Sequence, residues 1–125
     1  LWFLENLKIR SMLSFLYGLP GETKGTARAT FEFAKDILRD YSMVAGILTG
    51  FPIPLPGTQL FNELKLKIRP GEYQGDLERD DVFDYEQLVK LQIKYFTECS
   101  FEALRNFINK TSRLSAKVGK FGLTG

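Results

Sequence analysis

The chain has 125 residues, of which 44% are hydrophobic and 26% charged, a composition that indicates one globular domain and excludes an intrinsically disordered segment. No apolar run approaches the roughly 18 residues of a membrane span, and a net charge of +2 is too small to indicate nucleic-acid binding by itself. The absence of histidine removes the commonest metal ligand, and the single cysteine excludes an internal disulfide and favours a reducing, cytoplasmic location.

The chain begins and ends within patterned sequence. It starts at Leu1 inside an apolar segment, and the spacing over residues 1–9 predicts the end of a helix. It ends in GKFGLTG without a closing element. We therefore expect the chain to be part of a longer protein, with a missing N-terminal part as one of its partners; a processed or tagged small domain is the alternative.

The first half of the sequence predicts a strand, a helix and a second strand. Residues 11–17 (SMLSFLY) and residues 42–49 (SMVAGILT) are short apolar runs bounded by turn residues. Between them, residues 24–40 place apolar side chains every three or four positions, after Thr23 as a helix cap. A strand, a crossover helix and a strand make a βαβ unit with parallel strands. The near-continuous apolar character of both strands predicts that both faces are covered.

The second half predicts a stiff loop followed by helices. Pro52, Pro54 and Pro56 restrict the backbone of GFPIPLPGTQL, and Thr58 can cap a short helix over residues 59–67. Residues 69–75 are rich in turn residues, and residues 76–86 are acidic. Helical spacing then covers residues 85–99, and a further helical stripe follows Ser100 as its cap.

The segment SFLYGLPGET, residues 14–23, is the candidate site from local chemistry. Ligands of parallel α/β folds collect at the carboxyl ends of strands, where this turn is expected. Gly18 and Gly21 permit a close approach of the backbone, the following helix offers unpaired N–H groups, and Glu22 can accept hydrogen bonds. The turn therefore fits the edge of a nucleoside or a carboxylate, a phosphate, or no ligand at all.

Three motifs, in this order, resemble the later part of a radical S-adenosylmethionine domain. GLPGET follows the first strand, PGTQLFNELK follows the second, and LVKLQIKYFTECSFEALRNFI resembles the helical C-terminal region of these proteins. Within the family, the resemblance is to the cobalamin-binding class, which includes the anaerobic magnesium-protoporphyrin ester oxidative cyclase. It implies an α/β fold: part of a TIM-like barrel over residues 1–75, with two parallel strands and their crossover helices, and a helical extension over residues 76–125.

The resemblance also implies a contact with S-adenosylmethionine at the ends of both strands. Leu16 would pack against the adenine, and the backbone at Gly18 would pass close to the nucleoside. Backbone groups of Leu48 and Thr49 would touch the adenine edge. The implied cofactor-binding set is Leu16, Gly18, Leu19, Pro20, Gly21, Glu22, Leu48 and Thr49.

The sequence departs from the family at positions that carry its chemistry. Ser14 stands where the family motif has its first glycine, and Glu22 matches the acid of that motif only with a one-residue offset. The C-x3-C-x2-C motif that holds the [4Fe–4S] cluster is absent, because Cys99 is the only cysteine. We therefore expect the cluster on the missing upstream region, and no catalytic or metal-binding residue in this chain.

The resemblance implies an enzymatic role for the full-length parent only. The parent would cleave S-adenosylmethionine reductively at its cluster, draw on an electron donor and act on a small-molecule substrate, with cobalamin as an optional second cofactor. This chain would contribute adenine binding and part of the substrate cavity, and would be inactive alone. Two rivals remain open: a fragment of an α/β enzyme whose GLPGE turn binds phosphate, and a non-enzymatic interaction module built on the aromatic helices after Tyr85.

Three further patterns have structural explanations. Cys99, on a predicted apolar helix face, is expected to be a small core residue. Asp80, Asp81 and Asp84 lack the spacing of an EF-hand and predict a solvated helix start rather than a metal site. The basic stretch after residue 105 predicts a solvated helix face, so nucleic acid is not expected as a partner. Its cationic residues are Arg105, Lys110, Arg113, Lys117 and Lys120.

Overall fold

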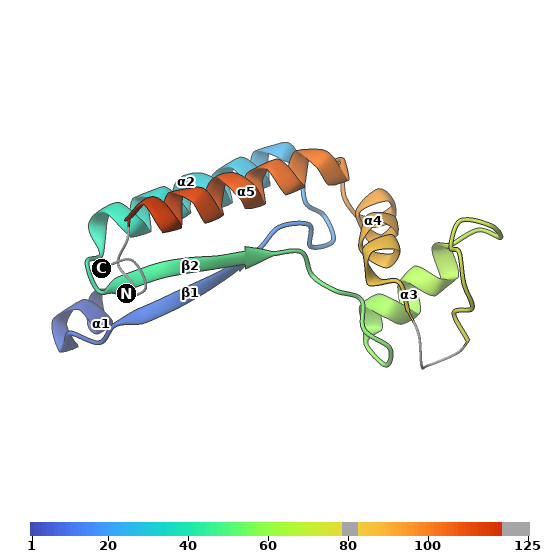
Figure 1. The fold of residues 1–125 in the computed structure, drawn as a ribbon, viewed down its shortest axis with the longest axis horizontal. Coiled ribbons are helices and arrows are strands. Elements are labelled where there is room, and N and C mark those ends of the chain that lie inside the picture. Colours follow the sequence, from blue (N-terminus) through green and yellow to red (C-terminus); the bar gives the residue numbers. More distant parts are fainter. Residues whose placement is uncertain (79–82, 119–125) are drawn as a thin grey trace.

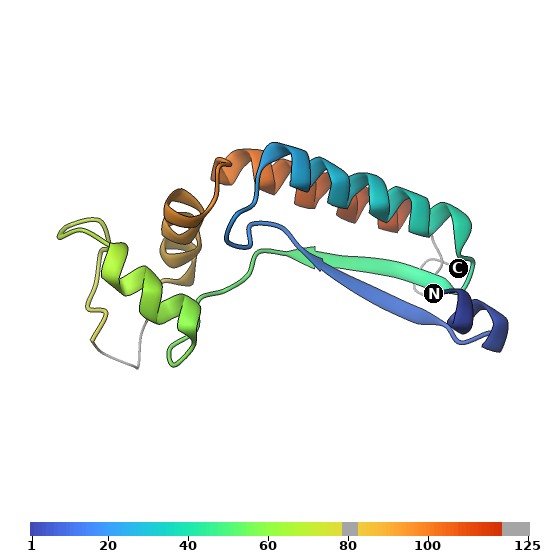
Figure 2. The ribbon, with the colours of Figure 1, turned by 180° about the vertical axis from the view of Figure 1, so that it is seen from behind.

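The computed structural model describes residues 1–78 and 83–118 and contains a two-stranded sheet with helices on one of its faces. The elements in chain order are α1 (Trp2–Leu7), β1 (Ser11–Leu16), α2 (Lys24–Asp40), β2 (Val44–Gly50), α3 (Gln59–Lys67), α4 (Tyr85–Phe96) and α5 (Phe101–Val118). Helices α2 and α5 run side by side along one face of the sheet, and α3 and α4 lie beyond the carboxyl ends of the strands (Figure 1, Figure 2). Within the described ranges, no helix combines the length and the hydrophobicity that crossing a bilayer requires.

The predicted βαβ unit is present. Strands β1 and β2 are parallel neighbours, and α2 makes the crossover between them. The start of α2 is fixed by a reciprocal pair of threonines: the Thr23 hydroxyl accepts from the Thr26 N–H at 3.1 Å, and the Thr26 hydroxyl accepts from the Thr23 N–H at 2.8 Å. The prediction of a mixed α/β fold with parallel strands is therefore confirmed.

Only one face of the sheet is covered by the described elements. Leu13 and Ile47 are register partners and lie on the side of the helices, where Ile47 is buried. The opposite face carries Met12, Leu16 and Leu48, which are 42%, 44% and 57% exposed. The expectation that both faces are covered is therefore wrong for this part of the chain. The physical reason is that α2 and α5 both pack on the same side.

Helix α5 also protects the edge of β2 that faces away from β1. The Ile47 N–H donates to the Ser115 hydroxyl at 2.8 Å, so a side chain on the helix satisfies a donor that a third strand would otherwise take. At the far end of the strand pair, the Tyr17 N–H donates to the Gly50 carbonyl at 3.0 Å. Successive peptide groups of a strand point to opposite edges, which explains why Ile47 and Gly50 have partners on different sides.

A buried hydrogen bond joins the end of β1 to the middle of α5. The Tyr17 side chain is fully buried, and its hydroxyl lies 2.9 Å from that of Thr111, which in turn donates to the Phe107 carbonyl at 2.8 Å. Burial raises the pKa of Tyr17 above its usual value, so the hydroxyl stays protonated. The surrounding core consists of Tyr17, Ala27, Val89, Ile93, Cys99 and Leu104.

A separate core holds α3 and α4 together. Thr58 caps α3 as predicted, because its hydroxyl accepts from the Phe61 N–H at 3.2 Å. The proline-rich loop is attached to α4 by the buried Gln92 amide, which donates to the Pro52 carbonyl at 2.6 Å. The buried members of this core are Phe61, Leu64, Tyr73 and Leu88.

Helix α4 ends earlier than the sequence predicts. It stops at Phe96, and Cys99 lies in the linker to α5 rather than on the helix. The Thr97 hydroxyl donates to the Ile93 carbonyl at 2.8 Å and accepts from the Cys99 N–H at 3.2 Å. These side-chain hydrogen bonds replace the backbone hydrogen bonds of a further helical turn, so the helix ends. Cys99 is nevertheless buried in the core around Tyr17, which confirms its packing role. The predicted Ser100 cap is confirmed, since its hydroxyl accepts from the Ala103 N–H at 3.1 Å.

The acidic segment before α4 is described only in part. Asp84 caps α4 by accepting from the Gln87 N–H at 3.2 Å, and hydrogen bonds from Gln87 lower the pKa of this carboxyl. The predicted helix start is therefore confirmed for Asp84. Asp80 and Asp81 lie outside the described residues, as does Lys120 in the basic stretch.

Glu72, in the loop before α4, is held by three donors. Its carboxylate accepts from the Lys94 ammonium at 2.6 Å, the Arg69 backbone N–H at 2.7 Å and the Tyr95 hydroxyl. These hydrogen bonds favour the charged form, with Lys94 contributing most, and lower the pKa of Glu72 from 4.5 to about 2. The loop is thereby tied to the last turns of α4.

Replacing Glu72 by Gln should lower the free energy of unfolding at neutral pH and matter less as the pH falls. The folded-state pKa lies below the ordinary value, so the stabilisation is present above about pH 4.5 and is lost as the pH falls toward about 2. Urea denaturation of both proteins at several pH values measures the difference. Glu98→Gln is the control, because the Glu98 side chain makes no hydrogen bond or ion pair with the described residues. A difference that is constant with pH would contradict the prediction.

Candidate functional site

The carboxyl ends of β1 and β2 bring Leu16 and Leu48 onto the same open face. Ser14 is the register partner of Leu48, and Leu16 is the partner of Gly50, so the two leucines are diagonal neighbours on adjacent strands. Both side chains are about half exposed, at 44% and 57%. Together with Met12 they form an apolar surface beside the turn that follows β1. Here "the open face" means the surface made by Met12, Ser14, Leu16 and Leu48.

Thr49 contributes to this end of the sheet through its backbone rather than its side chain. Its register partner is Phe15, on the side of the helices, and its hydroxyl is buried without a hydrogen-bond partner among the described residues. By the alternation along β2, its peptide N–H points to the same edge as that of Ile47. The structure therefore places the Thr49 side chain away from the open face and its backbone at the edge of the sheet.

Gly18 is required by packing between the turn and the helices. Its φ angle is +99°, and a Cβ at this position would lie 3.3 Å from Leu104 Cδ1 and 3.5 Å from Ile93 Cγ1. The residue is buried under α4 and α5. Gly21 also has a positive φ of +91°, but nothing lies within 4 Å of the place its Cβ would take. Both glycines shape the turn, and only Gly18 is also required for close packing.

The Glu22 side chain stabilises the turn through hydrogen bonds. Its carboxylate accepts from the Gly18 N–H at 3.2 Å and from the Thr26 hydroxyl, so it bridges the end of β1 and the first turn of α2. Its backbone carbonyl accepts from the Glu98 N–H at 2.8 Å, and the neighbouring Gly21 N–H donates to the Phe96 carbonyl at 2.7 Å. The segment that joins α4 to α5 therefore holds the turn in place by backbone hydrogen bonds. Leu19 and Pro20 remain exposed at its tip.

Most N–H groups of the turn already have acceptors within the protein. A phosphate-binding turn presents free backbone N–H groups to the anion. Here the N–H groups of Gly18, Gly21, Glu22, Thr23 and Thr26 donate to internal acceptors, and the Glu22 carboxylate beside them would repel an anion. Among the described residues, the N–H groups of Lys24 and Gly25 at the start of α2 have no such acceptor. The hydrogen bonds therefore disfavour a phosphate within the turn itself, and the start of α2 keeps the phosphate-binding alternative open.

The described residues do not suit an iron–sulfur cluster. No group of three or more cysteine or carboxylate side chains in the described ranges is arranged to hold a metal ion. Burial raises the pKa of the Cys99 thiol, which disfavours the thiolate that such a cluster needs. The described residues offer apolar surface and backbone groups to a ligand, but no cluster of side chains arranged to hold a metal.

Sequence analysis missed the residues that clamp the turn. Phe96 and Glu98 contact it through their backbones, and Leu104 lies against Gly18. These contacts join positions about 75 or more residues apart, and no local pattern signals them. A cavity of about 240 Å³ beside the proline-rich loop was also missed. It is lined by Phe51, Ile53, Tyr85, Glu86, Val89 and Phe101.

Replacing Gly18 by Ala should destabilise the protein more than replacing Gly21. Both changes place a side chain at positive φ, which costs about 1–2 kcal/mol. Gly18→Ala also forces a methyl group against Leu104, which adds about 1–3 kcal/mol. Urea denaturation of the two variants measures the difference, with Gly21→Ala as the matched control. Equal losses in the two variants would show that the close packing around Gly18 has no energetic weight.

Comparisons of the chain with protein-family models, with characterised proteins and with solved structures found no match. The functional interpretation therefore rests on the geometry of the open face and the turn.

Proposed function

We propose that the chain forms the adenine-binding wall of a larger parallel α/β domain of the radical S-adenosylmethionine type. The observation that carries the proposal is the open face, where Leu16 and Leu48 expose apolar side chains at the carboxyl ends of parallel strands. Ligands of parallel sheets are held at these ends. In the proposed domain, the helices cover the outside of the sheet and the open face looks inward.

The edges of the sheet support a larger assembly. A two-stranded sheet has two outer edges, and α5 protects only that of β2, through the bond from Ile47 to Ser115. The outer edge of β1 has no strand partner among the described elements. An unpaired edge beside an exposed apolar face is costly in water. Further strands on the β1 side would satisfy this edge and enclose the open face.

The contribution of this chain would be binding and orientation. Leu16 and Leu48 offer a flat apolar surface to a purine ring, and the peptide at Thr49 lies at the strand edge, where a backbone group can meet the polar rim of adenine. Glu22 would hold the shape of the turn, because its carboxylate already accepts from Gly18 and Thr26. S-adenosylmethionine supplies the chemistry when bound. Other parts of the parent would hold the cluster and any cobalamin and would receive the electron donor. They would also complete the substrate cavity, of which this chain forms one part.

Titration of the isotope-labelled chain with S-adenosylmethionine tests the proposal by nuclear magnetic resonance. We expect saturable shifts at the amides of residues 16–19 and 48–50, with a dissociation constant near the millimolar range, about −4 kcal/mol, because only one wall is present. Adenosine should shift the same amides and methionine should not, since this wall serves the adenine half.

Leu48→Asp should weaken the binding of adenosine about tenfold, because it places a charge where the purine ring would pack; this corresponds to about 1.4 kcal/mol. Leu66→Asp is the matched control, since Leu66 is 86% exposed on α3, away from the sheet. Absence of shifts at both strand ends, or equal binding by the two variants, would overturn the proposal. Shifts caused by methionine alone would argue against an adenine site.

A further inference from the structure

A basic groove lies between α2 and α5 on the side of these helices that faces away from the sheet core. Two adjoining cavities, of about 230 and 260 Å³, follow the helix pair and share Lys110 in their linings. Five cationic side chains line them: Lys24, Arg28, Lys110, Arg113 and Lys117. In the described part of the chain, no carboxylate lines either cavity. The whole protein has a net charge of only +2, so this positive charge is concentrated locally.

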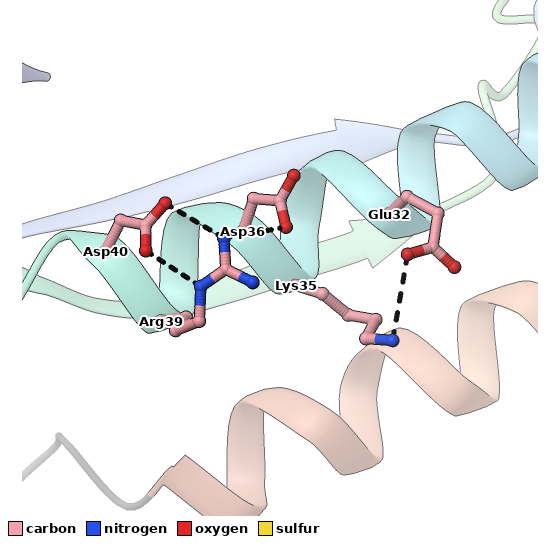
Figure 3. Close-up of polar contacts among 5 residues, drawn as sticks. All are labelled: Glu32, Lys35, Asp36, Arg39 and Asp40. Carbon is pink, nitrogen blue, oxygen red and sulfur yellow. Dashed lines mark hydrogen bonds and ion pairs between the residues drawn. The ribbon is translucent and has the colours of Figure 1, made fainter.

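None of these five cations forms a close ion pair with a described residue. The carboxylates of α2 are already engaged on their own helix, where Glu32 pairs with Lys35, and Asp36 and Asp40 pair with Arg39 (Figure 3). The groove therefore keeps a positive potential that favours an anionic ligand.

The floor of the groove is aromatic. Phe107 lines the first cavity and Phe31 the second, and their ring centroids lie 6.3 Å apart. Both rings are half-buried, and Phe107 stacks on the buried Tyr17 ring with centroids 5.8 Å apart, so only part of each ring is exposed to the groove. Lys110 lies over the Phe107 ring at 5.8 Å, which places charge and π-face side by side.

The length and width of the groove indicate which kind of anionic ligand fits it. The lining from Ala103 to Lys117 spans about 20 Å along the axis of α5, too long for a single phosphate. Packed helices lie only ~8–10 Å apart, so a rigid duplex is too wide to enter between them. An anionic membrane is disfavoured, because none of the described lining residues is an exposed large apolar side chain that could insert into it. A flexible single strand fits, because its phosphates can follow the cations while a base packs on the part of the Phe31 or Phe107 ring that is exposed.

The geometry points to the groove between α2 and α5 as a binding site for single-stranded nucleic acid. The binding is independent of sequence, because the groove offers charge and ring faces but only one side-chain amide, that of Asn106, to read base edges. This site lies on the opposite side of the sheet from the open face and does not depend on the adenine proposal. The sequence pattern favours a solvated helix, because the basic residues after position 105 are not interleaved with patterned aromatic residues; Lys24 and Arg28 join them only in the fold.

Fluorescence anisotropy with labelled oligouridylate and oligothymidylate of about 12 nucleotides tests the site. We expect saturable binding that weakens with salt, with a slope of log affinity against log salt near −0.7 for each phosphate neutralised. Lys110→Glu/Arg113→Glu should lower the affinity at least tenfold and reduce the slope by about 1.4. Lys24→Glu/Arg28→Glu, on the other wall, should have a similar effect. Oligothymidylate and oligouridylate should bind alike.

The matched control is Lys8→Glu/Lys67→Glu, which makes the same change in net charge at exposed positions outside both cavities. It should change the affinity less than twofold, and circular dichroism should show that all variants fold. Equal losses in the control and groove variants would overturn the proposal in favour of unspecific attraction. Binding of a duplex as tight as that of the single strand would overturn it. So would binding of anionic vesicles that the groove variants abolish while oligonucleotides do not bind.

Discussion

The packing of α5 against α2 and β2 is the interaction on which the rest of the structure depends. A two-stranded parallel sheet cannot bury its own apolar surface, and its edges expose unpaired donors. Helix α5 supplies both needs: it covers the same face as α2, and Ser115 accepts the N–H of Ile47. The buried bond between Tyr17 and Thr111 fixes the axial position of α5 along the sheet. Helix α5, the last of the described helices, thus completes the core begun by β1.

This packing has a direct consequence for the turn after β1. Because α5 begins just beyond the strands, the segment that joins α4 to α5 lies against the turn. There the Gly21 N–H donates to the Phe96 carbonyl, and the Glu22 carbonyl accepts from the Glu98 N–H. The glycine and the acid, which look from the sequence like ligand-binding groups, are therefore used to join the turn to the helices. The surface left for a ligand is the neighbouring open face, where Leu16 and Leu48 have no described element over them.

The two sides of the molecule differ in chemistry. The open face is mainly apolar, whereas the groove on the outer side of α2 and α5 combines aromatic rings with cations that form no ion pair with a described residue. Both follow from the same arrangement, because placing α2 and α5 together on one side leaves the other side of the sheet bare. The same arrangement also brings together basic residues from two distant segments.

Local sequence signals are enough to specify most of the helices and both strands. Hydrophobic spacing and the caps Thr23, Thr58 and Ser100 predicted α2, α3 and the start of α5, because these signals act within a few residues. The sequence also predicted a parallel βαβ unit and placed Leu16 and Leu48 at strand ends. Packing between distant segments sets what covers each surface. It leaves one face of the sheet covered, turns the Glu22 carboxylate toward the Gly18 N–H, places Cys99 beyond α4 and forms the basic groove. These depend on contacts between residues far apart in the chain, whose geometry no local pattern encodes.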